Sequence, residues 1–157
     1  MTYKEYRDKL RAEMDSLPVF YAFSDDQLIE EMEKRGLTAA DTDQLYKAEG
    51  MFYLRKDADQ VRAWMNRDHL AELRELIKKD EAFAEEAFMY EMGNHEYPIN
   101  TYQGDWDVCS CFGDVEWNEY RTGADYLRAL GFGDDTIAIY NRAKRKIRQQ
   151  WLENDWV

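Results

Sequence analysis

The chain has 157 residues, which is long enough to bury a sizeable core without disulfides or metal ions. Its apolar content of 45% and aromatic content of 15% exclude a disordered chain, despite a net charge of −12. That charge disfavours direct binding to nucleic acid or to an anionic membrane, and it favours a basic partner. We expect a single domain over residues 1–157.

The sequence also indicates where the protein resides. Its first residues are polar and have no apolar run behind them, so no signal peptide is predicted. No apolar stretch approaches the length of a membrane span. Cys109 and Cys111 lie too close together in sequence to join distant parts of a fold, which favours a reducing compartment. We therefore expect a cytoplasmic protein.

The first third of the chain carries two clear helix signals. Apolar residues at steps of three and four predict an amphipathic helix over residues 2–17, and Pro18 ends it. Ser24 and Gln27 have the spacing of a capping box, which begins a second helix. Gly36 ends this helix with a residue suited to the left-handed conformation.

Two short runs rich in aromatic and apolar residues are typical of β-strands, over residues 19–23 and 51–55. We expect them to pair as a two-stranded ribbon that lies on helices, because an isolated ribbon is only marginally stable. Between them, Thr38 and Asp41 repeat the capping pattern and predict a short helix that ends at Gly50.

The middle of the chain returns to a helical pattern. Residues 57–79 share an apolar face, with a predicted break over residues 66–68. An acidic helix follows over residues 81–92. Residues 94–104 contain proline, asparagine and glycine and predict an ordered loop.

The last third is predicted to hold three more helices. Asp105 or Asp107 caps a short helix that ends at Gly113. Another short helix covers residues 122–130, and the last covers residues 134–153 and carries the only dense basic cluster. The sequence therefore predicts a mainly α fold, a compact helical domain of the α+β kind with a minor two-stranded β element.

The most unusual feature is an acidic window over residues 80–120. It holds eleven carboxylates and neither lysine nor arginine. Such concentrated charge costs folding free energy through repulsion, so we expect it to serve a function. The predicted partner-binding residues are Glu81, Glu85, Glu86, Glu91, Glu96, Asp105, Asp107, Asp114, Glu116 and Glu119.

Two interpretations of this window stay open. It is either a solvated face partly neutralised by the protein's own basic C-terminal helix, or a surface that binds a basic protein partner. The sharpest form of the second is a nucleic-acid mimic that inhibits a host defence protein or another DNA-handling protein. We expect a non-enzymatic interaction protein without a cofactor.

The alternative function is a small metal-binding protein or a hydrolase-type enzyme centred on His95, Asp105 and Asp107. These residue types suit a divalent metal, but their spacing matches no established metal motif. On a helix, Cys109 and Cys111 would point about 200° apart, which is poor for chelation. The main prediction is therefore that the chain holds no metal.

His95 follows the end of the acidic helix, and its ring is expected to hydrogen-bond loop backbone or a carboxylate. A third use of the chain is a structural role in an oligomer, with exposed aromatic residues such as Trp156 as contacts. The sequence leaves the oligomeric state open.

Three segments carry a resemblance to a known family: residues 19–24, residues 94–97 and residues 104–107. The chain resembles an uncharacterised family of small proteins from phages and mobile elements of gut-type Gram-positive bacteria, over roughly residues 15–113. That family has no established activity, so the resemblance assigns no role to any residue. It implies a small cytoplasmic accessory protein of mobile DNA, a context in which binders and inhibitors are common.

Overall fold

The computed structural model describes residues 1–100 and 102–156. Its residues group into two compact units. Unit 1 comprises residues 1–8 and the chain from residue 68 onward, and unit 2 comprises residues 9–67. The boundary falls within helix α1 (Tyr3–Asp15) and again just before helix α4 (His69–Lys79). The expectation of one domain stays a prediction.

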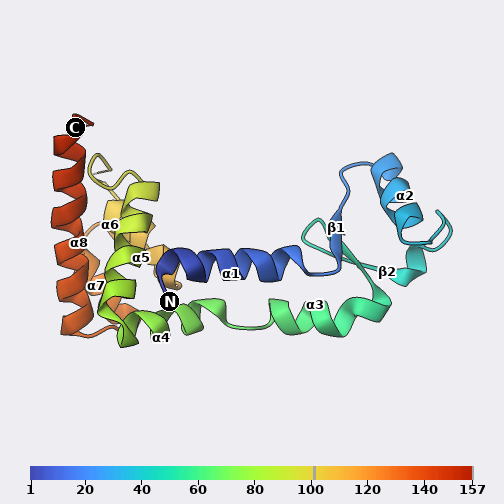
Figure 1. The fold of residues 1–157 in the computed structure, drawn as a ribbon, viewed down its shortest axis with the longest axis horizontal. Helices are drawn as coiled ribbons and strands as arrows, with labels where there is room; N and C mark the ends of the chain where they lie inside the picture. Colours follow the sequence, from blue (N-terminus) through green and yellow to red (C-terminus); the bar gives the residue numbers. More distant parts are fainter. Residues whose placement is uncertain (101, 157) are drawn as a thin grey trace. The chain divides into compact units, whose positions relative to one another are not determined.

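Unit 2 is built around a small antiparallel sheet. Strands β1 (Val19–Tyr21) and β2 (Leu45–Ala48) both pair with the central strand β3 (Met51–Leu54). The unit also contains helices α2 (Asp25–Lys34) and α3 (Ala58–Met65) and the part of α1 from residue 9 onward (Figure 1). The predicted pairing of the runs near residues 20 and 53 is present, and a third strand extends it.

The prediction of a helix between residues 38 and 50 is wrong. A single 3₁₀ turn at Thr42–Gln44 is followed by β2, which forms a hairpin with β3. Glu49 and Gly50 connect the two strands with φ angles of 51° and 82°. Positive φ at two successive residues is the geometry of a type I′ hairpin turn, so Gly50 serves the turn and does not end a helix.

The core of unit 2 lies on the sheet. Tyr53, Ala58 and Val61 are buried together, which packs β3 against α3. The predicted break over residues 66–68 separates α3 from α4, and the Asp68 carboxylate accepts a hydrogen bond of 2.9 Å from the backbone N–H of Ala71 in the first turn of α4. The break therefore has a local cause, because an N-cap residue lies at its end.

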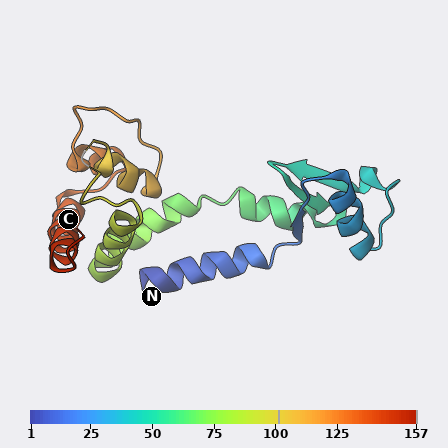
Figure 2. The same cartoon turned by 90° about the horizontal axis from the view of Figure 1, so that it is seen from above.

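Unit 1 is helical. It contains α4 (His69–Lys79), α5 (Glu81–Asn94), α6 (Gly104–Cys109), α7 (Gly123–Ala129) and α8 (Asp134–Glu153). Helices α5 and α8 lie side by side in both ribbon views (Figures 1 and 2). A buried aromatic group fixes their packing, because the Phe88 ring meets the edges or faces of Phe112 and Tyr140 at centroid distances of 5.2 and 5.1 Å.

The predicted range of the last helix matches α8, whose buried residues include Ile137, Tyr140 and Ile147. The prediction that Asp105 or Asp107 caps the short helix is wrong. Helix α6 begins at Gly104, and no side chain caps its first turn. Both aspartates lie inside that first turn, where their carboxylates contact other parts of unit 1.

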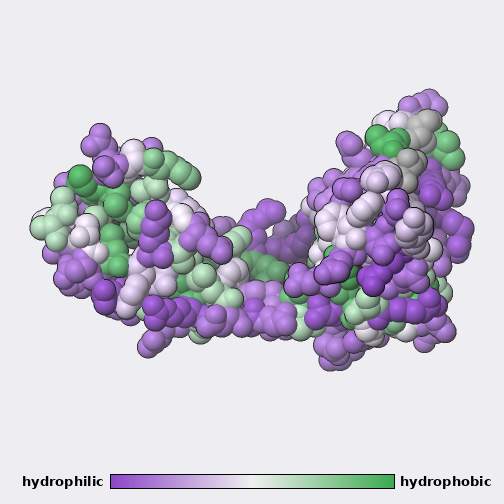
Figure 3. All heavy atoms as spheres, turned by 180° about the vertical axis from the view of Figure 1, so that it is seen from behind, coloured by the Kyte–Doolittle hydropathy of each residue, from purple (hydrophilic) through white to green (hydrophobic). Residues whose placement is uncertain are grey.

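The fold class is confirmed as mainly α with a small β element. Hydrophilic side chains cover most of the face drawn in Figure 3, and apolar side chains form small separate patches on it. Within the part of the chain that the structure describes, no helix is both long enough and apolar enough to cross a membrane.

Candidate functional site

Several of the predicted partner-binding residues pair with the protein's own cations. Arg142 on α8 lies 2.7 Å from a carboxylate oxygen of Glu81 and 2.9 Å from one of Glu85 on α5. Lys146, one turn further along α8, also pairs with Glu85. Lys146 and then Arg142 hold the pKa of Glu85 below its usual range. The two acids therefore join α5 to α8.

Two other acids of α5 have structural roles. Glu86 accepts hydrogen bonds from the backbone N–H groups of Tyr3 (3.0 Å) and Lys4 (3.1 Å), so it caps the start of α1. Glu91 is 8% exposed and accepts a hydrogen bond of 2.8 Å from the Tyr3 hydroxyl. These carboxylates connect the start of α1 to α5.

Asp105 and Asp107 face different neighbours. Asp105 accepts a hydrogen bond of 2.6 Å from the buried Tyr140 hydroxyl and pairs with Lys144 at 2.9 Å. Asp107 accepts hydrogen bonds from the amides of Asn100 (2.7 Å) and Gln103 (3.4 Å). One aspartate therefore joins α6 to α8, and the other closes the loop before α6.

The remaining acids are exposed: Glu96, Asp114, Glu116 and Glu119. In the described residues none of them forms an ion pair. Three belong to residues 114–120, a segment without helix or strand that also exposes Trp117 (40%) and Tyr120 (86%). We call residues 114–120 the acidic–aromatic segment.

The acidic–aromatic segment is held at two points. The Trp106 indole N–H donates to the Val115 carbonyl at 2.7 Å. The Tyr126 hydroxyl donates to the Asn118 carbonyl (3.0 Å) and accepts from the Asn118 N–H (3.2 Å). Because both anchoring side chains come from helices, the exposed side chains between these points are presented on a defined backbone.

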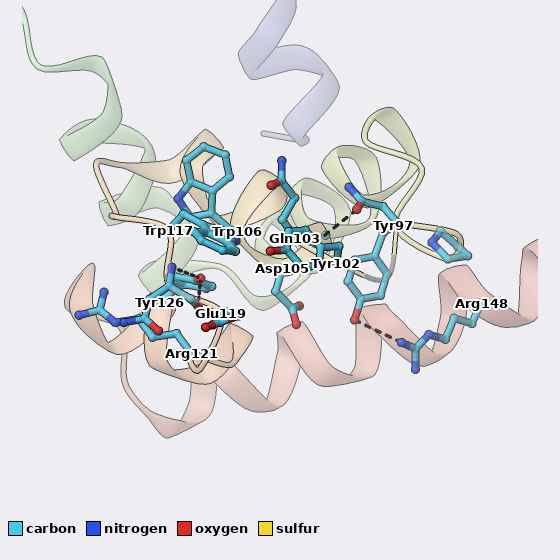
Figure 4. A pocket seen from close by; sticks show the side chains of 14 residues that line it. Tyr97, Tyr102, Gln103, Asp105, Trp106, Trp117, Glu119, Arg121, Tyr126 and Arg148 are labelled. Carbon is cyan, nitrogen blue, oxygen red and sulfur yellow. Dashed lines mark hydrogen bonds between the residues drawn. The ribbon is translucent and has the colours of Figure 1, made fainter.

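A pocket of about 330 Å³ lies beside this segment (Figure 4). The rings of Tyr102 and Trp117 meet over it at a centroid distance of 5.6 Å. Both signs of charge line it, from Asp105, Glu119, Arg121 and Arg148. Arg148 donates to the Tyr97 hydroxyl at 3.3 Å. The lining suits a polar group that can also stack on a ring.

His95 is the C-cap residue of α5, where the helix ends and the following loop begins. Its Nε2 atom is 3.2 Å from Cys111 Sγ and 3.7 Å from Glu91 Oε2. The sequence predicted a hydrogen bond from the His95 ring to loop backbone or a carboxylate; the Glu91 carboxylate lies near the ring at ion-pair distance, and the contact within hydrogen-bond distance is with the Cys111 thiol. Asp105 and Asp107, the other members of the predicted metal or hydrolase centre, have the separate partners described above.

Neither cysteine has the character of an activated nucleophile. Burial, followed by the nearby Glu91 carboxylate, raises the pKa of the Cys111 thiol to about 12. Burial likewise raises the pKa of Cys109 to about 12. Nucleophilic catalysis by cysteine needs the thiolate. The raised pKa values therefore argue against nucleophilic catalysis by either thiol at neutral pH.

The fold and these contacts define a small, mainly α-helical protein with a polar pocket and an exposed acidic–aromatic segment. The chain belongs to the family of unknown function DUF7659, whose family model matches residues 2–109. Comparisons with curated proteins and with solved structures find no match. The matched residues include Glu91 and His95 and end before the acidic–aromatic segment.

Proposed function

We propose that the protein is a non-enzymatic interaction protein that binds a basic surface of a protein partner through the acidic–aromatic segment. One observation carries the proposal. Asp114, Glu116 and Glu119 are exposed and unpaired in the described residues, whereas Glu81 and Glu85 are neutralised by α8. The proposed surface is thus smaller than the whole acidic window.

The aromatic residues of the segment strengthen the proposal. Exposed Trp117 lies between Glu116 and Glu119 and exposed Tyr120 follows Glu119, and tryptophan and tyrosine are enriched among the residues that dominate binding energy. The anchors at Trp106 and Tyr126 reduce the entropy lost when the segment is ordered by a partner. The free carboxylates accelerate encounter with a basic surface.

The pocket adds a place for one side chain of the partner. A lysine or arginine that enters beside Trp117 would meet the ring face and the Glu119 carboxylate. The proposed partner is a basic, nucleic-acid-handling protein, so the segment would act as a nucleic-acid mimic. A cytoplasmic, phage or mobile-element context, as the family resemblance implies, accords with such an inhibitor. The protein itself is proposed to contact neither nucleic acid nor membrane.

A salt-gradient pull-down from bacterial lysate tests the proposal. The full chain is tagged and compared with a variant that carries Asp114→Lys, Glu116→Lys and Glu119→Lys. We expect basic nucleic-acid-binding proteins to be released from the unaltered protein at moderate salt and to be missing from the variant. Added DNA should compete for the same proteins if the segment mimics a phosphate backbone.

The matched control carries Glu33→Lys, Asp43→Lys and Glu49→Lys, three exposed acids of unit 2. It changes the net charge by the same amount, so it should retain the partner. Equal loss from both variants would show that binding follows net charge alone, and retention by both would exclude the segment. Either result overturns the proposal.

A further inference from the structure

Three side chains with metal-ligating atoms converge at the end of α5. They are Glu91, His95 and Cys111, and their ligating atoms all lie within 4.8 Å of one another. In the described chain, no other group of three or more histidine, cysteine and acidic residues meets this condition. The cluster has no part in the proposed interaction with a basic partner.

The separations fit a tetrahedral ion. Zinc binds sulfur at about 2.3 Å and nitrogen or oxygen at about 2.0–2.1 Å, so tetrahedral angles place sulfur and nitrogen about 3.5 Å apart and nitrogen and oxygen about 3.3 Å apart. The Cys111 Sγ to His95 Nε2 distance is 3.2 Å, and the His95 Nε2 to Glu91 Oε2 distance is 3.7 Å. These two separations differ from the tetrahedral values by a few tenths of an ångström, and the Cys111 sulfur and the Glu91 carboxylate lie within 4.8 Å of each other.

The surrounding packing holds the three ligands in place. Glu91 and His95 are four residues apart, so they lie on the same side of the last turn of α5. Cys111 belongs to the short 3₁₀ turn Ser110–Phe112, which Phe112 fixes by packing on Phe88. Packing of this kind holds the ligands in position before an ion binds, as a preorganised metal site requires.

The neighbours of the ligands also fit a metal centre. The Tyr3 hydroxyl donates to Glu91 Oε1, which leaves Oε2 turned toward His95. Hydrogen bonds of this kind from an outer shell orient metal-binding carboxylates. Glu91 is buried, and the side chain with a nitrogen nearest its Oε2 atom in the described ion pairs is that of His95, at 3.7 Å. Buried carboxylates are usually paired or bound to a metal ion.

We propose that Glu91, His95 and Cys111 bind a zinc ion. Thiolate and imidazole favour zinc over the harder magnesium and calcium ions, and three protein ligands leave the fourth position to water. Access is available from solvent, since the His95 side chain is 33% exposed. The ligand set differs from the His95, Asp105 and Asp107 group that the sequence suggests.

A cobalt titration tests the site on the full chain. The protein is stripped with a chelator, kept reduced with a phosphine, and titrated with Co²⁺, which reports zinc sites spectroscopically. We expect a thiolate-to-cobalt charge-transfer band and the visible bands of a four-coordinate ion, saturating at one ion per chain. Added Zn²⁺ should remove both. A titration without a thiolate band overturns the proposal. This test uses the unaltered protein, so its result does not depend on whether a variant folds.

Two neighbouring cysteines supply a matched pair of variants. Cys111→Ser should abolish the charge-transfer band, whereas Cys109→Ser should keep it, because the Cys109 thiol lies against the Gly123 carbonyl. Tyr3→Phe should weaken Co²⁺ binding by about tenfold through loss of the outer-shell bond. Loss of the band in Cys109→Ser with retention in Cys111→Ser contradicts the assignment. Circular dichroism confirms the fold of each variant.

Discussion

Gly123 shows how closely the helices of unit 1 approach one another. A Cβ atom at this position would lie 2.7 Å from Cε1 of Tyr140 and 2.9 Å from Oδ1 of Asp105. The Tyr140 ring is fully buried, and its hydroxyl holds Asp105, so neither neighbour can move freely. The first residue of α7 therefore has to be small.

We predict that Gly123→Ala destabilises the protein by about 1–3 kcal/mol, because the added methyl group overpacks a filled interior. Urea unfolding measures the change. Gly93→Ala is the matched control. It lies in α5, and its nearest contact would be Ile147 Cδ1 at 4.0 Å. There alanine should stabilise the helix by about 0.5–1 kcal/mol, and equal loss from both variants would contradict the packing argument.

At the same scale, the sequence predicted the environment of His95 only in part. Because His95 follows the end of the acidic helix, its ring was expected to hydrogen-bond loop backbone or a carboxylate, and the Glu91 carboxylate lies 3.7 Å from it. Cys111 is distant in sequence and follows a loop and a separate helix. No spacing pattern links it to His95, since their contact arises from the packing of Phe112 on Phe88.

At the scale of elements, the pairing of α5 with α8 combines apolar and ionic contacts. Glu85 is only 16% exposed in its side chain and faces both Arg142 and Lys146. Because its pKa is lowered in the folded protein, its ion pairs add stability at pH values above its unfolded pKa. That contribution disappears as the pH falls through the folded pKa.

We predict that Glu85→Gln lowers stability at neutral pH by about 1 kcal/mol, or roughly 2–4 °C in Tm for a chain of this size. The difference from the unaltered protein should shrink to nothing once the pH has fallen below the lowered folded pKa of Glu85, where both proteins carry a neutral side chain. Thermal melts over a pH series measure this. The exposed Glu33→Gln on α2 should show no such pH-dependent difference.

The elements themselves were predicted to different degrees. The long helix α8 could be predicted because its apolar residues recur with helical spacing along its whole length. The break before α4 could be predicted because a capping residue, Asp68, lies at its end. Strand β2 was not predicted because Leu45–Ala48 is short and its residue types favour neither strand nor helix clearly. Only its pairing with β3 decides its conformation.

At the scale of the whole molecule, the acids exceed the bases by a net charge of −12. Ion pairs between α5 and α8 neutralise some of the acidic side chains. The remaining negative charges repel one another. The sequence left two interpretations of the acidic window open: a solvated face partly neutralised by the C-terminal helix, or a surface that binds a basic partner. In the structure, carboxylates of α5 face α8, while those of residues 114–119 are exposed.

We predict that added sodium chloride raises the Tm at neutral pH, because screening relieves net repulsion more than it weakens the few local ion pairs. Differential scanning calorimetry from about 0.01 M to about 0.5 M salt covers Debye lengths from roughly 30 Å down to a few ångströms. A Tm that falls steadily over this range would show that the local pairs dominate. Sucrose at matched osmolality serves as the control for general solvent effects.

The position of two tryptophans gives the protein an optical reporter of its own. Trp106 and Trp117 both line the pocket, and Trp106 also donates to the backbone of the segment beside it. Indole emission shifts in wavelength and intensity when water leaves the ring or a charge approaches it. Occupation of the pocket can therefore be followed in unlabelled protein by fluorescence, and Trp117→Phe would show whether the signal comes from the Trp117 ring.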